Sequence, residues 1–161
     1  MFYFCLDNWS KINDGPVCFG SKDSDFGAFH IKRTGRVTML KLVYISGEIV
    51  LAFLGGGNRW GVSNFLLSGR DYFVIILTNK SNSRILPIDA NILEQQILGY
   101  QIPGFNVFSP EIVLNFPSLF DVKSGEEYRL WHGEDLKDFI EWDNGGRICV
   151  DVYMMYITFV Y

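Results

Sequence analysis

Short apolar segments alternate with turn residues along most of the chain. Segments in which apolar and polar residues alternate predict strands with one buried face, and short continuous apolar runs predict strands that are covered on both faces. The spacing of these segments, about ten residues, is typical of a β-sandwich or a barrel. The predicted strands are residues 26–32, 37–45, 49–54, 71–78, 127–132 and 147–157.

Glycine and proline mark the connections between these segments. Residues 46–48 predict a turn, and the three glycines at 55–57 predict a flexible loop or bulge, because no Gly-Lys-Ser or Gly-Lys-Thr follows them as a phosphate-binding loop requires. Prolines punctuate residues 103–117, which predict loops around a short apolar segment. One helix is predicted, Ile92–Gly99, because its apolar residues recur at helical spacing and Gly99 can end it.

This pattern predicts an all-β fold, mainly antiparallel: a β-sandwich-like single domain over residues 1–161 with at most one short helix. The composition agrees with a packed core, since 48% of the residues are hydrophobic, 16% are aromatic and only 20% are charged. The sequence contains no internal repeat and no linker rich in proline, glycine and serine.

The distribution of charged and apolar residues argues against a nucleic-acid partner and against a membrane-spanning helix. The net charge is −4, and the densest basic segment, residues 30–36, is short, so no nucleic-acid partner is expected. No stretch reaches the ~18 apolar residues of a membrane-spanning helix. The N-terminus lacks the basic start of a signal sequence, so a secreted protein of this sequence is expected in its mature form.

Three cysteines leave two alternatives open. In a secreted protein, an odd number suggests one internal disulfide and one thiol for another chain. Cys5 lies near the N-terminus, where a mobile segment could reach a second subunit, and Cys18 and Cys149 would then pair. The alternative is three reduced and mostly buried thiols in a cytosolic protein.

An acidic segment, residues 133–146, carries most of the candidate chemistry. It lies between two predicted strands, so a surface loop is expected, and a calcium ion would offset the repulsion among its carboxylates with oxygen ligands. Gly145 and Gly146 would let the backbone turn tightly. The alternative is a solvated acidic loop without a ligand. The oxygen-bearing side chains are Glu134, Asp135, Asp138, Glu141, Asp143 and Asn144.

The spacing of this segment excludes two other metal sites. An EF-hand needs acidic residues at alternating positions, a central glycine and a closing glutamate, which are not present in that order. Zinc is disfavoured because only His132 is nearby. Trp131, Phe139 and Trp142 flank the acidic residues, and a ring beside calcium suits a sugar, although all three rings would also suit a core.

Three motifs in the last forty or so residues resemble a cnidarian family. They are Gly-Glu-Asp-Leu at 133–136, Asp-Asn-Gly-Gly at 143–146 and Cys-Val-Asp-Val-Tyr at 149–153. In this order they are similar to the calcium-dependent galactose-binding lectins of sea anemones and to the C-terminal region of coral skeletal organic matrix proteins. The resemblance implies a secreted lectin that forms a disulfide-linked dimer. Cys5 would join the two chains, and Cys18 would pair with Cys149 within each chain.

The same resemblance implies a set of site residues. Calcium would bridge the protein to the neighbouring 3- and 4-hydroxyls of a terminal galactose, as in lactose and other β-galactosides, while an aromatic ring covers the C–H face of the sugar. The implied calcium ligands are Glu134, Asp135, Glu141, Asp143 and Asn144. The implied stacking residue is Trp142, then Trp131, with Phe120 or Phe139 as further candidates.

Two other functions compete with this interpretation. A glycoside hydrolase could use two carboxylates such as Glu134 and Glu141, but all the acids lie on one short segment. Nucleophilic catalysis is disfavoured because His30 and His132 are far apart and no Gly-x-Ser-x-Gly motif occurs, so no enzyme is expected. The second alternative is a calcium-braced structural or adhesive matrix module that binds no sugar.

Overall fold

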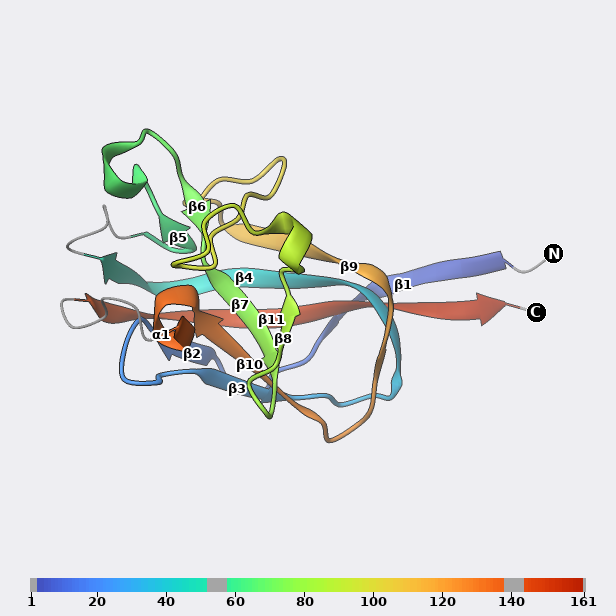
Figure 1. Ribbon diagram of the computed structural model, residues 1–161. Coiled ribbons are helices and arrows are strands. Elements are labelled where there is room, and N and C mark those ends of the chain that lie inside the picture. Colours follow the sequence, from blue (N-terminus) through green and yellow to red (C-terminus); the bar gives the residue numbers. More distant parts are fainter. Residues whose placement is uncertain (1–2, 52–57, 138–143, 161) are drawn as a thin grey trace.

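A computed structural model describes residues 3–51, 58–137 and 144–160 of the chain. Two antiparallel sheets form the framework, and Figure 1 shows the shorter sheet crossing in front of the longer one. The longer sheet has the order β1 (Tyr3–Lys11), β11 (Asn144–Val160), β4 (Gly35–Leu51) and β9 (Glu111–Val122), and β2 (Val17–Gly20) also pairs with β11. The shorter sheet has the order β3 (Gly27–His30), β10 (Glu127–His132), β7 (Ile75–Asn79) and β8 (Arg84–Leu86).

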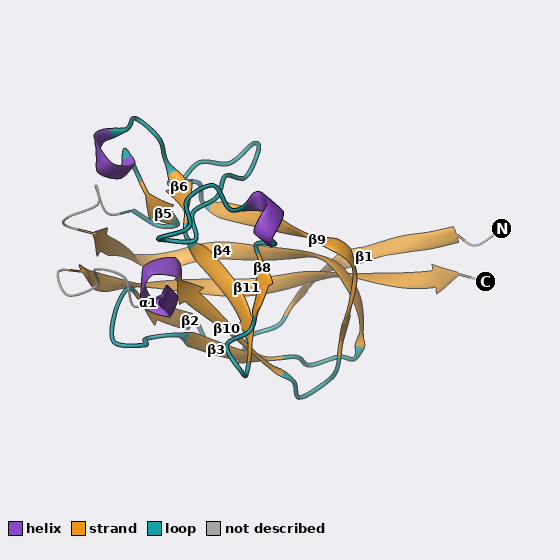
Figure 2. Cartoon of the chain, in the orientation of Figure 1, coloured by secondary structure: helices purple, strands orange, loops and turns teal. Residues whose placement is uncertain are grey.

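The remaining elements are short. Figure 2 shows that strands and loops make up most of the described chain, which confirms the predicted all-β, sandwich-like class. The one α-helix among the described residues is α1 (Gly133–Lys137). A small ribbon and two 3₁₀ helices complete the set: β5 (Gly61–Val62), β6 (Tyr72–Phe73), η1 (Phe65–Leu67) and η2 (Asp89–Asn91).

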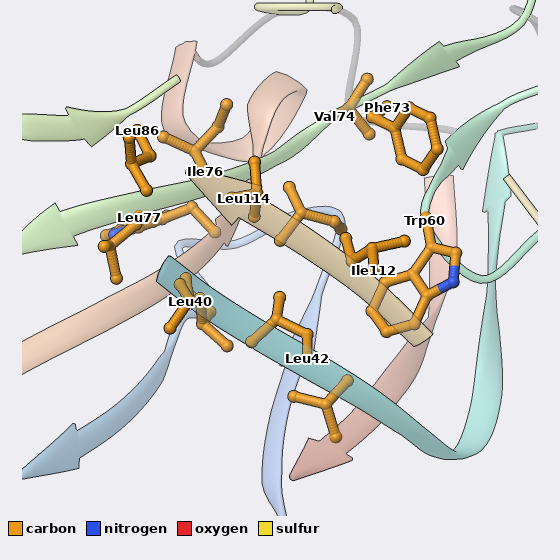
Figure 3. Packing of buried hydrophobic residues seen from close by; sticks show 14 of the residues in the cluster. Leu40, Leu42, Trp60, Phe73, Val74, Ile76, Leu77, Leu86, Ile112 and Leu114 are labelled. Carbon is orange, nitrogen blue, oxygen red and sulfur yellow. The ribbon is translucent and has the colours of Figure 1, made fainter. Parts of the chain in front are cut away.

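Apolar side chains from both sheets meet in the core. Figure 3 shows Leu40 and Leu42 of β4 beside Ile112 and Leu114 of β9, with Leu77 of β7 near them. On β9 the buried residues alternate with more exposed ones from residue 111 to residue 116, as expected for a strand with one covered face. Burial of this apolar surface is the main favourable term in folding.

The predicted turn at residues 46–48 is wrong, because β4 continues through it as one strand. Gly47 has a φ of +86°, and a Cβ at this position would lie 2.0 Å from the carbonyl oxygen of Arg147. The pairing of β4 with β11 also shifts by one residue between Cys149 and Val150. A glycine that suggests a turn in the sequence therefore allows a close approach of two strands, next to a bulge.

The predicted helix Ile92–Gly99 is also wrong. The backbone forms a tight turn closed by a pair of hydrogen bonds between Glu94 and Gly99, at 2.8 and 3.2 Å. Leu98 has a φ of +54°, which no α-helix accommodates. Ile97 and Leu98 are buried, so the helical spacing of the apolar residues reflects the burial of a turn.

The predicted loops at residues 103–117 are only partly correct, since β9 begins at Glu111 and continues past Pro117 to Val122. Pairing with β4 runs regularly as far as Asn115 opposite Met39 and resumes at Phe120 opposite Val37. Pro117 thus lies in an irregular stretch where no ladder hydrogen bond is required of it.

The N-terminal residues form strands that the sequence pattern did not indicate. β1 pairs with β11 from Tyr3 opposite Val160 to Lys11 opposite Tyr153, so Cys5 lies in a strand and not in a mobile segment. The predicted loop at 55–57 and the end of the predicted strand 49–54 lie outside the described residues. No helix in the described ranges is long and apolar enough to cross a membrane.

Candidate functional site

Two of the expected calcium ligands, Glu134 and Asp135, belong to a short helix and not to a surface loop. α1 follows β10 without a gap, and the N–H of its first residue, Gly133, donates to the carbonyl of Val74 at 2.8 Å. Glu134 and Asp135 are both buried. Carboxylates are rarely buried without compensating partners, so their neighbours determine what this part of the molecule can bind.

Asp135 holds the connection between β2 and β3. Its Oδ1 accepts a hydrogen bond from the backbone N–H of Ser24 and its Oδ2 accepts one from the N–H of Asp25, both at 2.8 Å. Hydrogen bonds from amides to an ionised carboxylate are stronger than those between neutral groups. The acidic helix and the 21–25 loop are therefore one structural unit.

Glu134 is joined to the start of β11. The side-chain amide of Asn144 donates to Oε2 of Glu134 and, at 3.5 Å, to the carbonyl of Ser21. Ser21 in turn donates its hydroxyl to the carbonyl of Gly145 at 3.3 Å. All of Glu134, Asn144 and Ser21 are buried, so the structure brings together three of the five expected ligands: Glu134, Asp135 and Asn144.

A cleft of about 540 Å³ opens beside this unit, between the 21–25 loop and the first residues of β11. Its lining combines backbone from Gly145 and Gly146 with side chains of Asp23 and Asp25. The guanidinium of Arg147 binds both carboxylate oxygens of Asp25, at 2.8 and 3.1 Å, which fixes one wall of the cleft.

The expected tight turn at Gly145 and Gly146 is instead strand backbone. Gly146 has a φ of +83°, and a Cβ there would lie 2.2 Å from the carbonyl oxygen of Glu48. Gly146 thus lets β11 approach β4 closely, directly beside the cleft.

The donor set suits a hard cation. Its atoms are carboxylate, amide and hydroxyl oxygens, which calcium and magnesium prefer and which zinc and copper use less. Within the described ranges, no three residues among histidine, cysteine, aspartate and glutamate are grouped closely enough to hold an ion by themselves. Four of the site residues predicted from the sequence lie within 138–143, outside the described residues: Phe139, Glu141, Trp142 and Asp143.

His132 precedes the acidic helix and is fully buried. Neither ring nitrogen has a hydrogen-bond partner among the described residues. Burial lowers the pKa of this imidazole from 6.5 to about 3, because a protonated ring would lose its hydration. His132 is therefore neutral at physiological pH.

The two expected stacking residues that the structure describes lie away from the cleft. Trp131 is 3% exposed, and its indole N–H donates to Oγ1 of Thr78 at 3.1 Å. Buried in this way, the ring presents no face to a sugar and serves packing. Phe120 pairs with Val37 near the start of β4, whereas Asn144 pairs with Leu51 at the end of that strand. Phe120 therefore belongs to a different part of the surface.

The expected disulfide is present. Cys18 of β2 and Cys149 of β11 are directly opposite each other and are covalently linked. This excludes the alternative of three reduced thiols, and structural disulfides are typical of proteins from oxidising compartments. Cys5 is exposed on β1, where it pairs with Thr158 of β11.

The 21–25 loop is the part of the candidate site that the sequence analysis missed. Its run Ser-Lys-Asp-Ser-Asp places two carboxylates and two hydroxyls between apolar segments, which is a usable but weak signal. The loop gains its importance from contacts with residues more than 100 positions away.

A solved structure with the same fold is the lectin AJLec from the sea anemone Anthopleura japonica. It shares 28% sequence identity with this chain and superposes with a TM-score of 0.79 over 91% of this chain and 96% of its own. No family model and no curated protein sequence matches the chain. The chain thus has the fold of a cnidarian lectin, as its C-terminal motifs indicated.

Proposed function

We propose that this protein is a secreted, calcium-dependent lectin that binds terminal galactose and other β-galactosides. The observation that carries the proposal is the similarity to a sea anemone lectin over nearly the whole chain. The disulfide between Cys18 and Cys149 supports secretion.

The calcium site of this proposal lies where the acidic helix meets β11. Glu134, Glu141, Asp143 and Asn144 supply side-chain oxygens. Asp135 is better suited to holding the 21–25 loop, because each of its oxygens already accepts a backbone N–H. Calcium accepts six to eight oxygens, so ligands from carbonyls, water and two sugar hydroxyls complete the shell.

Galactose fits this chemistry because its 3- and 4-hydroxyls lie on the same side of the ring and can chelate one cation. We propose Trp142 as the ring that covers the opposite C–H face, since Trp131 is in the core. A glycoside hydrolase that uses Glu134 has no support, because this carboxylate is buried and bound to Asn144.

Calorimetric titration with lactose tests the proposal. We expect heat of binding when calcium is present and none when a chelator is in excess. Heat that is equal in both conditions contradicts a metal-bridged site. Calcium binding without any lactose heat, by a protein that is folded, contradicts sugar binding and supports the calcium-braced matrix module instead.

The variant Glu134→Gln locates the ion. The substitution keeps the shape of the side chain and an oxygen for Asn144, but it removes the negative charge, so we expect calcium affinity to fall by about tenfold or more and the lactose heat to fall with it. The matched control is Asp121→Asn on β9, whose side chain is 73% exposed and forms an ion pair with Arg36. Unchanged calcium affinity in Glu134→Gln would place the ion elsewhere.

We further propose that the protein is a homodimer joined through Cys5. β1 is the edge strand of the longer sheet, and Cys5 is exposed on it. Edge strands present backbone groups to which a second chain can bind. Two sugar sites in one dimer would raise avidity on a surface coated with glycans, provided that both sites can engage at once.

The dimer can be checked on non-reducing gels. We expect a band at twice the 18.5 kDa of one chain, and we expect Cys5→Ser or a reducing agent to convert it to the single-chain band. Wild-type protein that migrates as a single chain without reductant would exclude an interchain disulfide at Cys5.

A further inference from the structure

A second cleft lies between the two sheets, away from the acidic helix, and has a volume of about 640 Å³. Two turns form its walls: the hairpin turn between β7 and β8 contributes Lys80 and Ser81, and the turn that connects β9 to β10 contributes Gly125 and Glu126. Tyr128 lies at its base, five residues before Gly133, a separation of about 17 Å along β10. One sugar ring cannot occupy both clefts.

The ring of Phe120 forms part of the lining of this cleft and packs against two other aromatic rings. It stacks on Phe116 with 4.8 Å between centroids and an angle of 7° between the planes. The edge of this pair meets Tyr128 at 6.1 Å, and Tyr128 in turn stacks on Phe29 of the core. Phe120 remains partly exposed, so the core supports a fixed aromatic surface at the cleft.

Both turns are ordered by their own hydrogen bonds. Oδ1 of Asn79 accepts the backbone N–H groups of Ser81 and Ser83, at 2.9 and 3.0 Å. Oε2 of Glu126 accepts the hydroxyl of Tyr128 at 2.8 Å and the N–H of Lys123 at 3.0 Å. Walls that are ordered before a ligand arrives reduce the entropy lost on binding.

The charges at this cleft balance. Lys80 offsets one of the two carboxylates, Glu126 and Glu127, and Arg129 lies 3.5 Å from Glu127. A balanced rim offers hydrogen-bond donors and acceptors without selecting an anion or a cation. Together with an aromatic face, it matches a neutral molecule that carries hydroxyl groups on one side and C–H groups on the other.

We propose that this cleft is a second carbohydrate subsite, which binds a neutral hexose against Phe120 without calcium. The inference extends the proposed lectin function but does not require the calcium site. Two subsites of different chemistry on one chain would let the protein engage two branches of one glycan or two neighbouring glycans, with a gain in avidity.

Amide NMR of the Cys5→Ser variant in excess chelator tests the subsite, because the calcium site is then inactive. Galactose, mannose and N-acetylglucosamine are titrated one at a time to about 50 mM, as single sugar rings commonly bind with millimolar constants. We expect at least one of them to shift the amides of Lys80, Ser81, Gly125 and Glu126 in a saturable way.

Two substitutions in the same exposed turn supply the control. Ser81→Tyr fills the cleft and is expected to weaken binding by about tenfold, whereas Ser83→Tyr adds the same ring beside the cleft and is expected to leave binding unchanged. Phe120→Leu, which keeps an apolar side chain but removes the flat ring, is expected to weaken binding to a similar degree as Ser81→Tyr.

The outcomes separate the two sites. Shifts confined to Ser21–Asp25 and Gly145–Arg147, and only with calcium, would overturn the subsite while supporting the calcium-dependent lectin. Shifts at the cleft that Ser81→Tyr and Ser83→Tyr affect equally would also overturn it. Saturable shifts at the cleft in chelator, with no calcium-dependent lactose heat, would support the subsite and contradict the calcium site.

Discussion

Acidification from pH 7 to pH 4 is expected to lower the free energy of unfolding by about 3 kcal/mol through His132 alone. Burial lowers the pKa of this imidazole to about 3 in the folded protein, whereas a hydrated imidazole in the unfolded chain has an ordinary pKa of about 6.5. The unfolded chain therefore binds a proton that the folded chain does not, and each pH unit between these two values costs about 1.4 kcal/mol. The free energy of unfolding therefore does not depend on the protonation of His132 above about pH 6.5, and it decreases as the pH falls from 6.5 towards 3.

Comparison with His132→Leu isolates this contribution from that of the carboxylates. Leucine keeps a similar volume and removes two buried ring nitrogens that have no partner among the described residues, so we expect the variant to be at least as stable as the wild type at pH 7. Urea unfolding in the presence of a chelator, at several pH values from 7 to 4, should show the stability difference between the two proteins growing by about 3 kcal/mol.

His30 supplies the control because its side chain is exposed. His30→Gln, a histidine substitution at the surface, is therefore unfolded in parallel at the same pH values. Parallel curves for His132→Leu and the wild type would contradict the prediction and would mean that the buried ring gains a partner or water in solution.

Removal of the disulfide is expected to lower the free energy of unfolding by about 3–5 kcal/mol. Cys18 and Cys149 are 131 residues apart in the sequence, so the bond restricts most of the unfolded chain, and the chain-entropy estimate for a loop of this length is about 5 kcal/mol. The double variant Cys18→Ala with Cys149→Ala, compared with the parent in the Cys5→Ser background by urea unfolding, measures the difference.

The same variant separates stability from binding. β2 pairs with β11 beside the disulfide, and Asp135 and Arg147 still hold the 21–25 loop, so we expect calcium affinity in the folded variant to change by less than about threefold. A reductant should destabilise the parent by the same amount and leave the variant unaffected. A stability loss below about 1 kcal/mol would show that the unfolded chain is already compact near these residues.

Strands with a regular pattern were predictable. The predicted strand 127–132 has the same bounds as β10, and the predicted strand 147–157 lies within β11. Local rules failed where a residue that usually interrupts structure was accommodated by its surroundings. Gly47 lies in a paired strand beside a bulge, and Pro117 lies in an irregular stretch of β9, because a neighbouring strand makes these exceptions favourable.

The candidate site was predictable only in part. The density of carboxylates after β10 drew attention to Glu134, Asp135 and Asn144, and the structure joins Glu134 to Asn144 through a hydrogen bond; their role as calcium ligands stays a prediction. Their burial did not follow from composition, since acidic segments are usually solvated. The role of Trp131 was also misjudged, because the identity of a ring does not reveal which other rings cover it; here Phe26 does so, at 4.9 Å between centroids.

The sequence by itself determined the strand-rich class, the short acidic segment and the likeness to cnidarian lectins. These depend on residue periodicity and on motifs of a few neighbouring residues, which are properties of the chain alone. Only the tertiary structure decided that Asp135 holds Ser24, 111 positions away, that His132 is buried and neutral, and that Phe120 faces a second cleft. Such contacts arise from the register and packing of distant strands, which no local pattern specifies.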